Sequence, residues 1–324
     1  MMSADHRPQP AAPNRFLVTG GAGFLGSALA NRLAAAGHRV YALDDLSNGD
    51  PTRLDPRVDF TLGDIDNVPL LWSLLQNVDC AYHLAARVSV PQSILYPREY
   101  ARVNVGGTVS LMEAMRDTGV GRVIFTSSGA VYGRQPRQPV REDDLPHPDS
   151  PYAVSKWSAE QYVRTIGELW GLETVALRIF NAYGPGQSLP VSHAPVVPRF
   201  LKEALAGGSL VVFGDGRQTR DYIYVDDVID ALIGAATTTG LGHAVINIGN
   251  GRETSVNELI AQIERATGRH ANVIHNPEKQ GGVPQLAADV GRARQLLGFE
   301  PKIDLETGLR LTLDQDARFG RAKA

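Results

Sequence analysis

The sequence predicts an α/β protein with a doubly wound parallel sheet, followed by a smaller α/β domain. Short apolar runs alternate with segments of helical spacing through the N-terminal half of the chain. A glycine-rich turn follows directly after the first apolar run. Strands that alternate with helices imply a parallel sheet with right-handed crossovers. In such sheets, ligands bind at the carboxyl ends of the strands.

The individual elements follow in order along the chain. Apolar runs predict strands at 15–19, 39–43, 58–62, 80–84, 122–127 and 174–179. Helical spacing predicts helices at 24–36, 68–76, 98–117 and 150–169. After Asn181, glycine, proline and serine crowd the stretch 183–198, and the elements become shorter. We therefore place a first domain at 14–182, to which 221–240 returns, and a second domain at 183–220 and 241–324.

The composition is that of an ordinary globular chain of 324 residues, 43% hydrophobic and 21% charged. A formal net charge of −3 gives no basic surface for DNA or RNA, so no nucleic-acid partner is expected. The single cysteine, Cys80, lies in an apolar run, and a buried thiol suits a reducing cytoplasm.

Neither a signal peptide nor a membrane span is expected. Residues 1–13 are polar and proline-rich, which predicts a disordered tail. No apolar stretch approaches the ~20 residues that a membrane-spanning helix requires. We therefore expect a soluble, cytoplasmic protein.

The turn after the first strand has the spacing of a dinucleotide-binding fingerprint. Its residues are Thr19-Gly20-Gly21-Ala22-Gly23-Phe24-Leu25-Gly26. Glycines permit a tight turn and a close approach of the backbone to a pyrophosphate, whose charge the helix N-terminus favours. The second strand ends at Asp44, about 20 residues further on, where the fingerprint requires an acid. A turn that merely contains glycines is the alternative, and the context on both sides argues against it.

Asp44 also indicates which dinucleotide binds. A carboxylate at this place accepts both ribose hydroxyls but repels a 2′-phosphate, and Asp45 adds negative charge, so NAD is predicted over NADP. For Asp64, expected at the adenine, a surface turn is the alternative. The other residues expected at NAD from this part of the chain are Gly20, Gly23, Phe24, Leu25, Gly26, Asn48, Gly49, Ile65, Leu84, Ala85, Ala86 and Arg87.

Tyr152 and Lys156 lie four residues apart, and therefore on one face of a helix. The pair predicts a general acid/base in which Lys156 favours the phenolate and lowers the pKa of Tyr152 toward neutrality. This spacing also occurs by chance on many helices, so the setting decides. Hydroxyl side chains at 126–128 end the preceding strand at the ligand-binding edge, where one can hydrogen-bond the reacting oxygen. We therefore predict a catalytic set of Ser128, Tyr152 and Lys156.

These motifs resemble the NAD-dependent nucleotide-sugar epimerase/dehydratase family of the extended short-chain dehydrogenases/reductases. Three further motifs match it: Arg178-x-x-Asn181-x-Tyr183-Gly184-Pro185, Gly214-Asp215-Gly216-x-Gln218-Thr219-Arg220-Asp221 and Val225-Asp226-Asp227-Val228. The resemblance covers nearly the whole chain after residue 14 and implies a Rossmann-type fold.

The resemblance also implies roles for individual residues. It assigns catalysis to Ser128, Tyr152 and Lys156, with Lys156 also holding the nicotinamide ribose. Asn104 and Phe180 are expected against NAD. Asn181 is expected at the phosphates of a nucleotide-sugar, and Arg220 as a cationic clamp whose fork donates two hydrogen bonds at once. A solvated surface arginine is the alternative for Arg220.

The same family pattern helps to choose a reaction. Dehydratases of the family carry Asp-Glu just after the catalytic hydroxyl residue, and its decarboxylases usually carry a nearby Glu. Here Gly129 and Ala130 stand in those places, and neither offers an acid. Hydride transfer alone remains, which favours a 4-epimerase for UDP-glucose/UDP-galactose or a related UDP-hexose, N-acetylated and uronic acid forms included.

Two alternatives stay open. One is another nucleotide-sugar enzyme, a 4-ketoreductase or an epimerase acting on dTDP- or GDP-sugars. The other is a non-catalytic NAD-binding protein, which would have no need of all three residues of the catalytic set.

One motif departs from the family. Where its members usually carry Arg-Pro-Gly-Asp, this chain has Lys279-Gln280-Gly281-Gly282. Lys279 can supply charge to a substrate phosphate but not the bidentate geometry of arginine.

Metal ions are not expected, since the histidines show no ligand spacing. His83, in the fourth strand, is interpreted as a core histidine with satisfied hydrogen bonds. By resemblance, helices near 98–117 and 152–169 would pair in a homodimer through a four-helix interface.

Overall fold

The structure is a computed structural model that describes residues 14–190, 194–277 and 282–319. A parallel sheet of seven strands runs through it in the order β11-β6-β5-β4-β1-β2-β3. Its strands are β1 (Arg15–Thr19), β2 (Arg39–Asp44), β3 (Asp59–Leu62), β4 (Cys80–His83), β5 (Arg122–Ser128), β6 (Glu173–Ile179) and β11 (Val245–Ile248). The sheet confirms the predicted doubly wound fold. Its strand order reverses between β1 and β4, which is where such folds bind their ligands.

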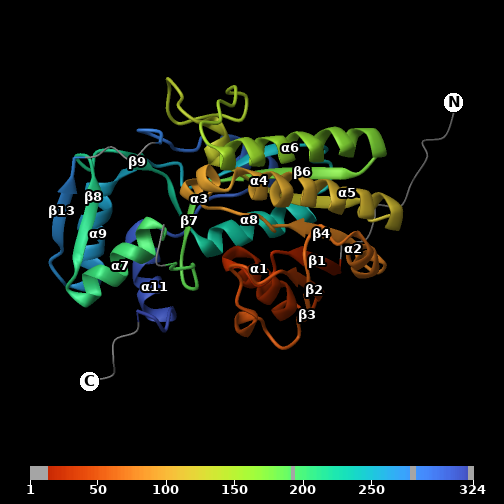
Figure 1. The fold of residues 1–324 in the computed structure, drawn as a ribbon, viewed down its shortest axis with the longest axis horizontal. Helices are drawn as coiled ribbons and strands as arrows, with labels where there is room; N and C mark the ends of the chain where they lie inside the picture. The colour runs from red at the N-terminus through yellow and green to blue at the C-terminus, as the bar shows by residue number, and fades with distance from the viewer. Residues whose placement is uncertain (1–13, 191–193, 278–281, 320–324) are drawn as a thin grey trace.

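Helices cover both faces of this sheet (Figure 1). One face carries α2 (Val68–Leu75), α5 (Gly107–Thr118) and α6 (Pro151–Trp170); the other carries α1 (Phe24–Ala35), α8 (Val225–Thr237) and α10 (Gly291–Leu297). Successive strand residues point to opposite faces, so Val18 packs with α1 and α8 while Leu17 packs with α2 and α5. Because both faces are buried, the strands read as continuous apolar runs rather than alternating ones.

The helix predicted at 98–117 is not a single regular helix. It consists of α4 (Pro97–Tyr100), a π-helical turn η2 (Ala101–Gly106) and α5, and it is preceded by the unpredicted α3 (Val90–Leu95). Two 3-10 turns, η1 (Pro51–Arg53) and η3 (Gly129–Tyr132), follow β2 and β5. Single π-turns inserted in α-helices occur frequently at functional sites.

The remaining elements form a smaller unit beside the carboxyl ends of the sheet (Figure 1). They are β7 (Asn181–Tyr183), α7 (Val196–Ala206), β8 (Ser209–Phe213), β9 (Thr219–Arg220), β10 (Tyr222–Tyr224), β12 (Thr254–Ser255), α9 (Val256–Thr267), β13 (Asn272–Asn276) and α11 (Leu305–Gln315). They form three two-stranded sheets, β7-β10, β9-β12 and β8-β13. A capping box of Ser255 and Glu258 starts α9, which packs on α7 and α11.

The boundary predicted at residue 241 differs from the structure, because two elements beyond it, β11 and α10, lie with the central sheet. β11 lies within 241–324, yet it completes the central sheet by pairing with β6. The segment 245–248 was overlooked because four residues of a fully buried strand carry no periodic pattern. The other boundaries of the two domains stay a prediction.

Candidate active site

A cavity of about 670 Å³ opens at the carboxyl ends of the central strands, between the sheet and the smaller unit. This volume lies within the range that is typical of small-molecule and cofactor sites. Most residues predicted from the sequence line it: Gly20, Gly23, Phe24, Leu25, Gly26, Asp44, Asp45, Asn48, Gly49, Ile65, Leu84, Ala85, Ala86, Arg87, Ser128, Tyr152, Lys156, Phe180, Asn181 and Arg220. Two predicted residues, Asp64 and Asn104, are not among its lining residues.

The glycine turn has the close-packed geometry that a dinucleotide fingerprint requires. Gly20 has a φ of +68°, and a Cβ there would lie 2.8 Å from the Ala85 nitrogen. A Cβ on Gly26 would lie 2.0 Å from the Gly20 carbonyl oxygen, so α1 can pack against the turn only with glycine at this position. Gly23 is the N-cap of α1 and lines the cavity. The turn therefore presents a helix N-terminus and open backbone to the cavity, which fits a pyrophosphate.

Asp44 ends β2 at the edge of the same cavity. Its carboxylate accepts hydrogen bonds from the backbone nitrogens of Ala22, at 3.0 Å, and Leu46, at 2.8 Å. Burial raises the pKa of Asp44 above its ordinary value, and these backbone hydrogen bonds oppose that rise. These hydrogen bonds fix the orientation of the carboxylate beside the glycine turn. A carboxylate at this place suits the hydroxyls of an adenosine ribose.

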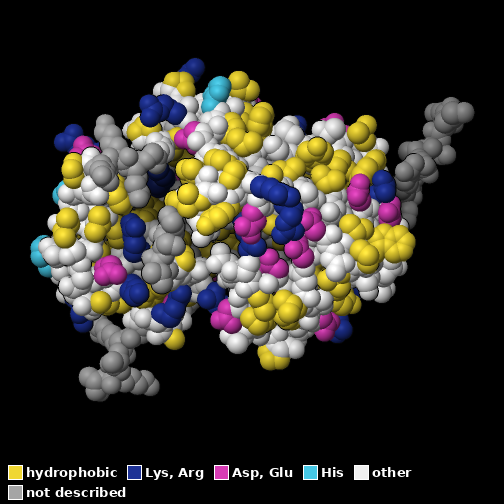
Figure 2. All heavy atoms as spheres, viewed as in Figure 1, with side chains coloured by type: hydrophobic (Ala, Val, Ile, Leu, Met, Phe, Trp, Pro, Cys, Tyr) yellow, Lys and Arg dark blue, Asp and Glu magenta, His cyan; other side chains and the backbone are white. Residues whose placement is uncertain are grey.

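Ion pairs surround this end of the cavity. Arg87 contacts Asp45 at 3.3 Å and Glu99 at 2.9 Å. Asp64, which is not among the lining residues, forms an ion pair with Arg102 at 3.2 Å, and Arg102 also pairs with Asp66 at 2.6 Å. Figure 2 shows basic side chains bordered by acidic ones on this part of the surface, below α4 and α5 in the view of Figure 1.

Asn104 lies behind the cavity wall rather than in it. It is 2% exposed and sits in the π-turn η2. Its side chain accepts from the backbone nitrogen of Arg87 at 2.7 Å and donates to the Arg87 carbonyl at 3.0 Å and to Ser155 Oγ at 2.9 Å. These contacts join the strand end that carries Arg87 to the first turn of α6.

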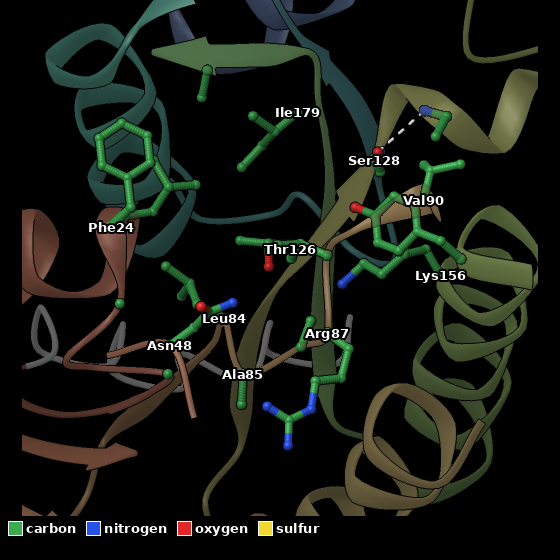
Figure 3. A pocket seen from close by; sticks show the side chains of 18 of the residues that line it. Phe24, Asn48, Leu84, Ala85, Arg87, Val90, Thr126, Ser128, Lys156 and Ile179 are labelled. Carbon is green, nitrogen blue, oxygen red and sulfur yellow. Dashed lines mark hydrogen bonds between the residues drawn. The ribbon is translucent and has the colours of Figure 1, made fainter. Parts of the chain in front are cut away.

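The three predicted catalytic residues all line the cavity. Figure 3 shows two of them, Ser128 and Lys156, on the same side of it. Ser128 ends β5, and its Oγ accepts from the Ala130 nitrogen at 3.1 Å. Tyr152 and Lys156 lie on the first two turns of α6, whose N-cap Ser150 accepts from the Ala153 nitrogen at 3.3 Å. Lys156 is 3% exposed, and its Nζ lies 4.5 Å from the centre of the Phe125 ring.

The pKa values of this pair differ from the prediction. Burial raises the pKa of Tyr152 above its ordinary value, and a hydrogen bond with Ser128 only partly offsets this. Burial also lowers the pKa of Lys156 to about 7, against the opposing charge of Glu160. The chain's own groups therefore do not produce the predicted lowering of the tyrosine pKa, because desolvation raises it and the opposing hydrogen bond comes from Ser128 rather than from Lys156. Near neutral pH, the pair can nevertheless lose or gain one proton through Lys156.

The side of the cavity where the substrate is predicted to bind is formed by β7, β9 and loops. Arg220 donates to the Thr219 carbonyl at 2.7 Å, and within the described ranges it has no carboxylate within ion-pair distance. Burial lowers its pKa, so its charge is incompletely compensated. Lys279 lies outside the described residues. Sequence reasoning missed several lining residues because their loop segments carry no motif: Asp149, Val283 and Leu286.

Other sequence-based interpretations can be compared with the structure. Cys80 is fully buried, and burial raises its pKa to about 12, which agrees with an inert thiol. Across residues 14–190, 194–277 and 282–319, no group of three or more His, Cys, Asp or Glu side chains is arranged to hold a metal. The same ranges contain no helix with the length and apolarity to cross a membrane.

Comparisons with known proteins agree with this geometry. Residues 16–249 match the NAD dependent epimerase/dehydratase family. A UDP-glucose 4-epimerase of Mycolicibacterium smegmatis is 41% identical over 93% of this chain and 97% of its own length. A Thermotoga maritima UDP-glucose 4-epimerase, solved with UDP-glucose, superposes with a TM-score of 0.88 at 37% identity, covering 92% of this chain and 97% of that one. The Thermus thermophilus enzyme, solved with NAD, has a TM-score of 0.86 at 32% identity, covering 93% and 98%.

Proposed function

This chain belongs to the NAD-dependent epimerase/dehydratase family, and from that premise we propose that it is a UDP-hexose 4-epimerase. The substrate is UDP-glucose/UDP-galactose or a closely related UDP-hexose. The observation that carries the proposal is the convergence of Ser128, Tyr152 and Lys156 on a cavity whose other end has the geometry of an NAD site.

In the proposed reaction, Tyr152 takes the proton of the sugar 4-hydroxyl while the C4–H bond breaks and a 4-keto sugar forms. NAD, which the glycine turn and Asp44 would hold, would supply the hydride acceptor for C4 and would return the hydride, so no reduced cofactor would accumulate. Ser128 donates a hydrogen bond to the reacting oxygen, and Lys156 exchanges the proton with Tyr152. After the keto sugar has turned over in the cavity, Tyr152 gives the proton back and the opposite C4 configuration results.

The wall beside Ser128 supports epimerisation over dehydration. Gly129 occupies the place of a dehydratase acid, and a Cβ there would meet the Phe180 ring at 3.1 Å. An acidic side chain could not be added at this position without displacing that ring. Among the described lining residues, only Asp44, Asp45 and Asp149 carry a carboxyl group, and the first two lie at the NAD end. If the enzyme were a dehydratase, Asp149 would therefore have to serve as its acid.

Arg220 supports the proposal that the substrate carries a nucleotide diphosphate group. Arg220 lines the cavity, and within the described part of the chain Asp149 is the carboxylate whose charge acts on it. A diphosphate would supply the missing negative charge, and a guanidinium suits it because its fork donates two parallel hydrogen bonds.

We extend the proposal to a homodimer formed through α5 and α6. On α6, the apolar side chains Val154, Tyr162 and Leu169 are 46%, 47% and 74% exposed. They follow one another at intervals of eight and seven residues and therefore share one face of the helix. A second copy of the chain would cover this face.

The test is turnover of purified protein on UDP-glucose, UDP-galactose and their N-acetylated and uronic acid forms, with NAD present and products separated by stereochemistry. We expect interconversion of one 4-epimer pair without net NADH. Tyr152→Phe should abolish it, whereas Tyr162→Phe, on the exposed face of the same helix, should leave it unchanged.

Two other results would identify the alternatives. Loss of water from the sugar, abolished by Asp149→Asn, would indicate a dehydratase. Net consumption of NADH on a dTDP- or GDP-linked 4-keto sugar, with no turnover of any UDP-sugar, would indicate a ketoreductase and overturn the proposal.

A further inference from the structure

His83 is a buried histidine at the end of β4 with two hydroxyl partners. It is 1% exposed. Its Nδ1 lies 2.8 Å from Thr19 Oγ1, at the end of β1, and its Nε2 lies 2.8 Å from Thr108 Oγ1, on α5. Both contacts join it to elements on which the NAD end of the cavity depends.

The partners of the two hydroxyls fix the direction of every hydrogen bond. Thr108 Oγ1 donates its single hydrogen to the Asn104 carbonyl at 2.6 Å, so it must accept from His83. Nε2 therefore carries the imidazole hydrogen, and Nδ1 accepts from Thr19 Oγ1. The Thr19 hydroxyl in turn accepts from the Ala85 nitrogen at 3.2 Å. One directed chain thus runs from Ala85 through Thr19, His83 and Thr108 to Asn104.

A doubly protonated imidazole would break this chain. Both ring nitrogens would then donate, and the Thr19 hydroxyl would receive two donors while its own hydrogen lost the histidine as acceptor. Burial, with a smaller contribution from the positive charge of Lys156, lowers the pKa of His83 to about 3. Phe125, whose ring lies 5.7 Å from the imidazole, adds no charge. The surroundings therefore hold the ring neutral.

Both ends of the chain lead to the functional site. Ala85 lines the cavity beside the glycine turn. The Asn104 side chain hydrogen-bonds both the backbone nitrogen and the carbonyl of Arg87, and it also donates to Ser155. The Ser155 hydroxyl in turn donates to the Tyr152 carbonyl at 2.8 Å. The chain therefore connects the floor of the cavity to the turn of α6 that carries the predicted acid/base pair.

We propose that His83 is a positioning residue which, as the neutral Nε2–H tautomer, fixes the floor of the NAD cavity against the helix that carries Tyr152 and Lys156. Its catalytic consequence rests on the proposed function, but its effect on NAD binding and its tautomer do not. A merely space-filling histidine would require no particular protonation state.

The experiment compares His83→Gln with His83→Phe. Glutamine can supply a donor and an acceptor in place of the two ring nitrogens, whereas phenylalanine keeps the aromatic volume and loses both. We expect His83→Phe to weaken NAD binding about tenfold or more by calorimetry, the size of effect that an unpaired buried polar group produces. His83→Gln should stay within about threefold of the parent protein, because both hydrogen bonds can be remade.

A second pair of variants breaks the chain at another link. Thr108→Val removes the hydroxyl between His83 and Asn104, and it should weaken NAD binding in the same direction. Thr118→Val is the matched control, because among the described residues the Thr118 hydroxyl donates to carbonyls of its own helix, those of Ala114 and Met115. In nitrogen NMR of the histidine-labelled parent protein, Nε2 should be of the protonated type and Nδ1 of the unprotonated type throughout pH 5–8.

The results also separate this proposal from the epimerase assignment. NAD affinity and the NMR signature are measured without any sugar, so a wrong substrate leaves them unaffected. A protonated Nδ1, or NAD binding by His83→Phe as tight as or tighter than by His83→Gln, would overturn the positioning role even if epimerisation were confirmed.

Discussion

Arg178 and Glu160 form an ion pair of 2.7 Å in which the two side chains are 4% and 0% exposed. Glu160 also accepts from Ser127 Oγ at 2.6 Å, and Arg178 donates to Tyr132 Oη at 2.8 Å. The pair therefore joins α6, β5 and β6 behind the cavity wall that carries Ser128, Tyr152 and Lys156.

Removal of one partner should destabilise the fold strongly. Glu160→Gln leaves the Arg178 charge buried without its carboxylate, and we expect a loss of about 3–5 kcal/mol in the free energy of unfolding. Urea denaturation measures it, with the exposed Glu168→Gln on the same helix as control. A loss no greater than that of the control would show that the pair contributes nothing to stability.

Lys156 should make stability depend on pH. Its pKa falls from 10.5 in the unfolded chain to about 7 in the fold, so its stabilising contribution is present above pH 10.5 and is lost as pH falls through 7. Lys156→Met removes that charging cost. The gain in the free energy of unfolding of the variant over the parent should be larger at pH 6 than at pH 10, by about 1–4 kcal/mol. The variant should also lose activity. Equal effects at both pH values would contradict the prediction.

Asp44 should set the preference for NAD over NADP. Its carboxylate is held at the cavity edge by two backbone hydrogen bonds and would repel a 2′-phosphate. We expect Asp44→Ser to lower the ratio of the NAD affinity to the NADP affinity at least about tenfold, because one close charge repulsion is lost. Calorimetry measures both affinities. Asp59→Ser, on the neighbouring strand and outside the lining residues, serves as control. An unchanged ratio would assign the selectivity to another group.

Arg53 should control binding of the nucleotide-sugar. Its guanidinium donates to the Gly186 carbonyl at 2.5 Å, and the Gly186 nitrogen donates to Asp316 at 2.8 Å. This loop continues into Gln187, which lines the cavity. Arg53→Met should therefore raise KM about three- to tenfold with little change in kcat, as expected when ground-state and transition-state binding weaken together. The exposed Arg57→Met is the control, and an equal fall in kcat would contradict the prediction.

The exposed face of α6 should determine the oligomeric state. Tyr162→Glu with Leu169→Glu places charge at the centre of the proposed interface, which should convert a dimer into a monomer in light scattering after gel filtration. Trp72→Glu, a half-exposed apolar residue on α2, should leave the dimer intact. A monomeric parent protein would refute the dimer directly.

Local spacing alone determined the parts of this protein that act within a few residues of one another. The glycine turn requires backbone freedom at Gly20 and Gly26, which is a property of the residues themselves. Tyr152 and Lys156 share a helix face because helical geometry places residues four apart together. Asp44 ends a strand whose apolar run is visible in the sequence. For these features, the sequence predicted the local structure and which residues line the cavity.

Tertiary structure decided what depends on segments far apart in the chain. Burial by surrounding elements, rather than the lysine four residues away, sets the direction of the Tyr152 pKa. The four residues of β11 join the sheet only because β6 offers a free edge. The tautomer of His83 follows from Thr19 and Thr108, 64 and 25 residues away. Desolvation, strand pairing and hydrogen-bond direction are properties of the assembled neighbours, and no local pattern encodes them.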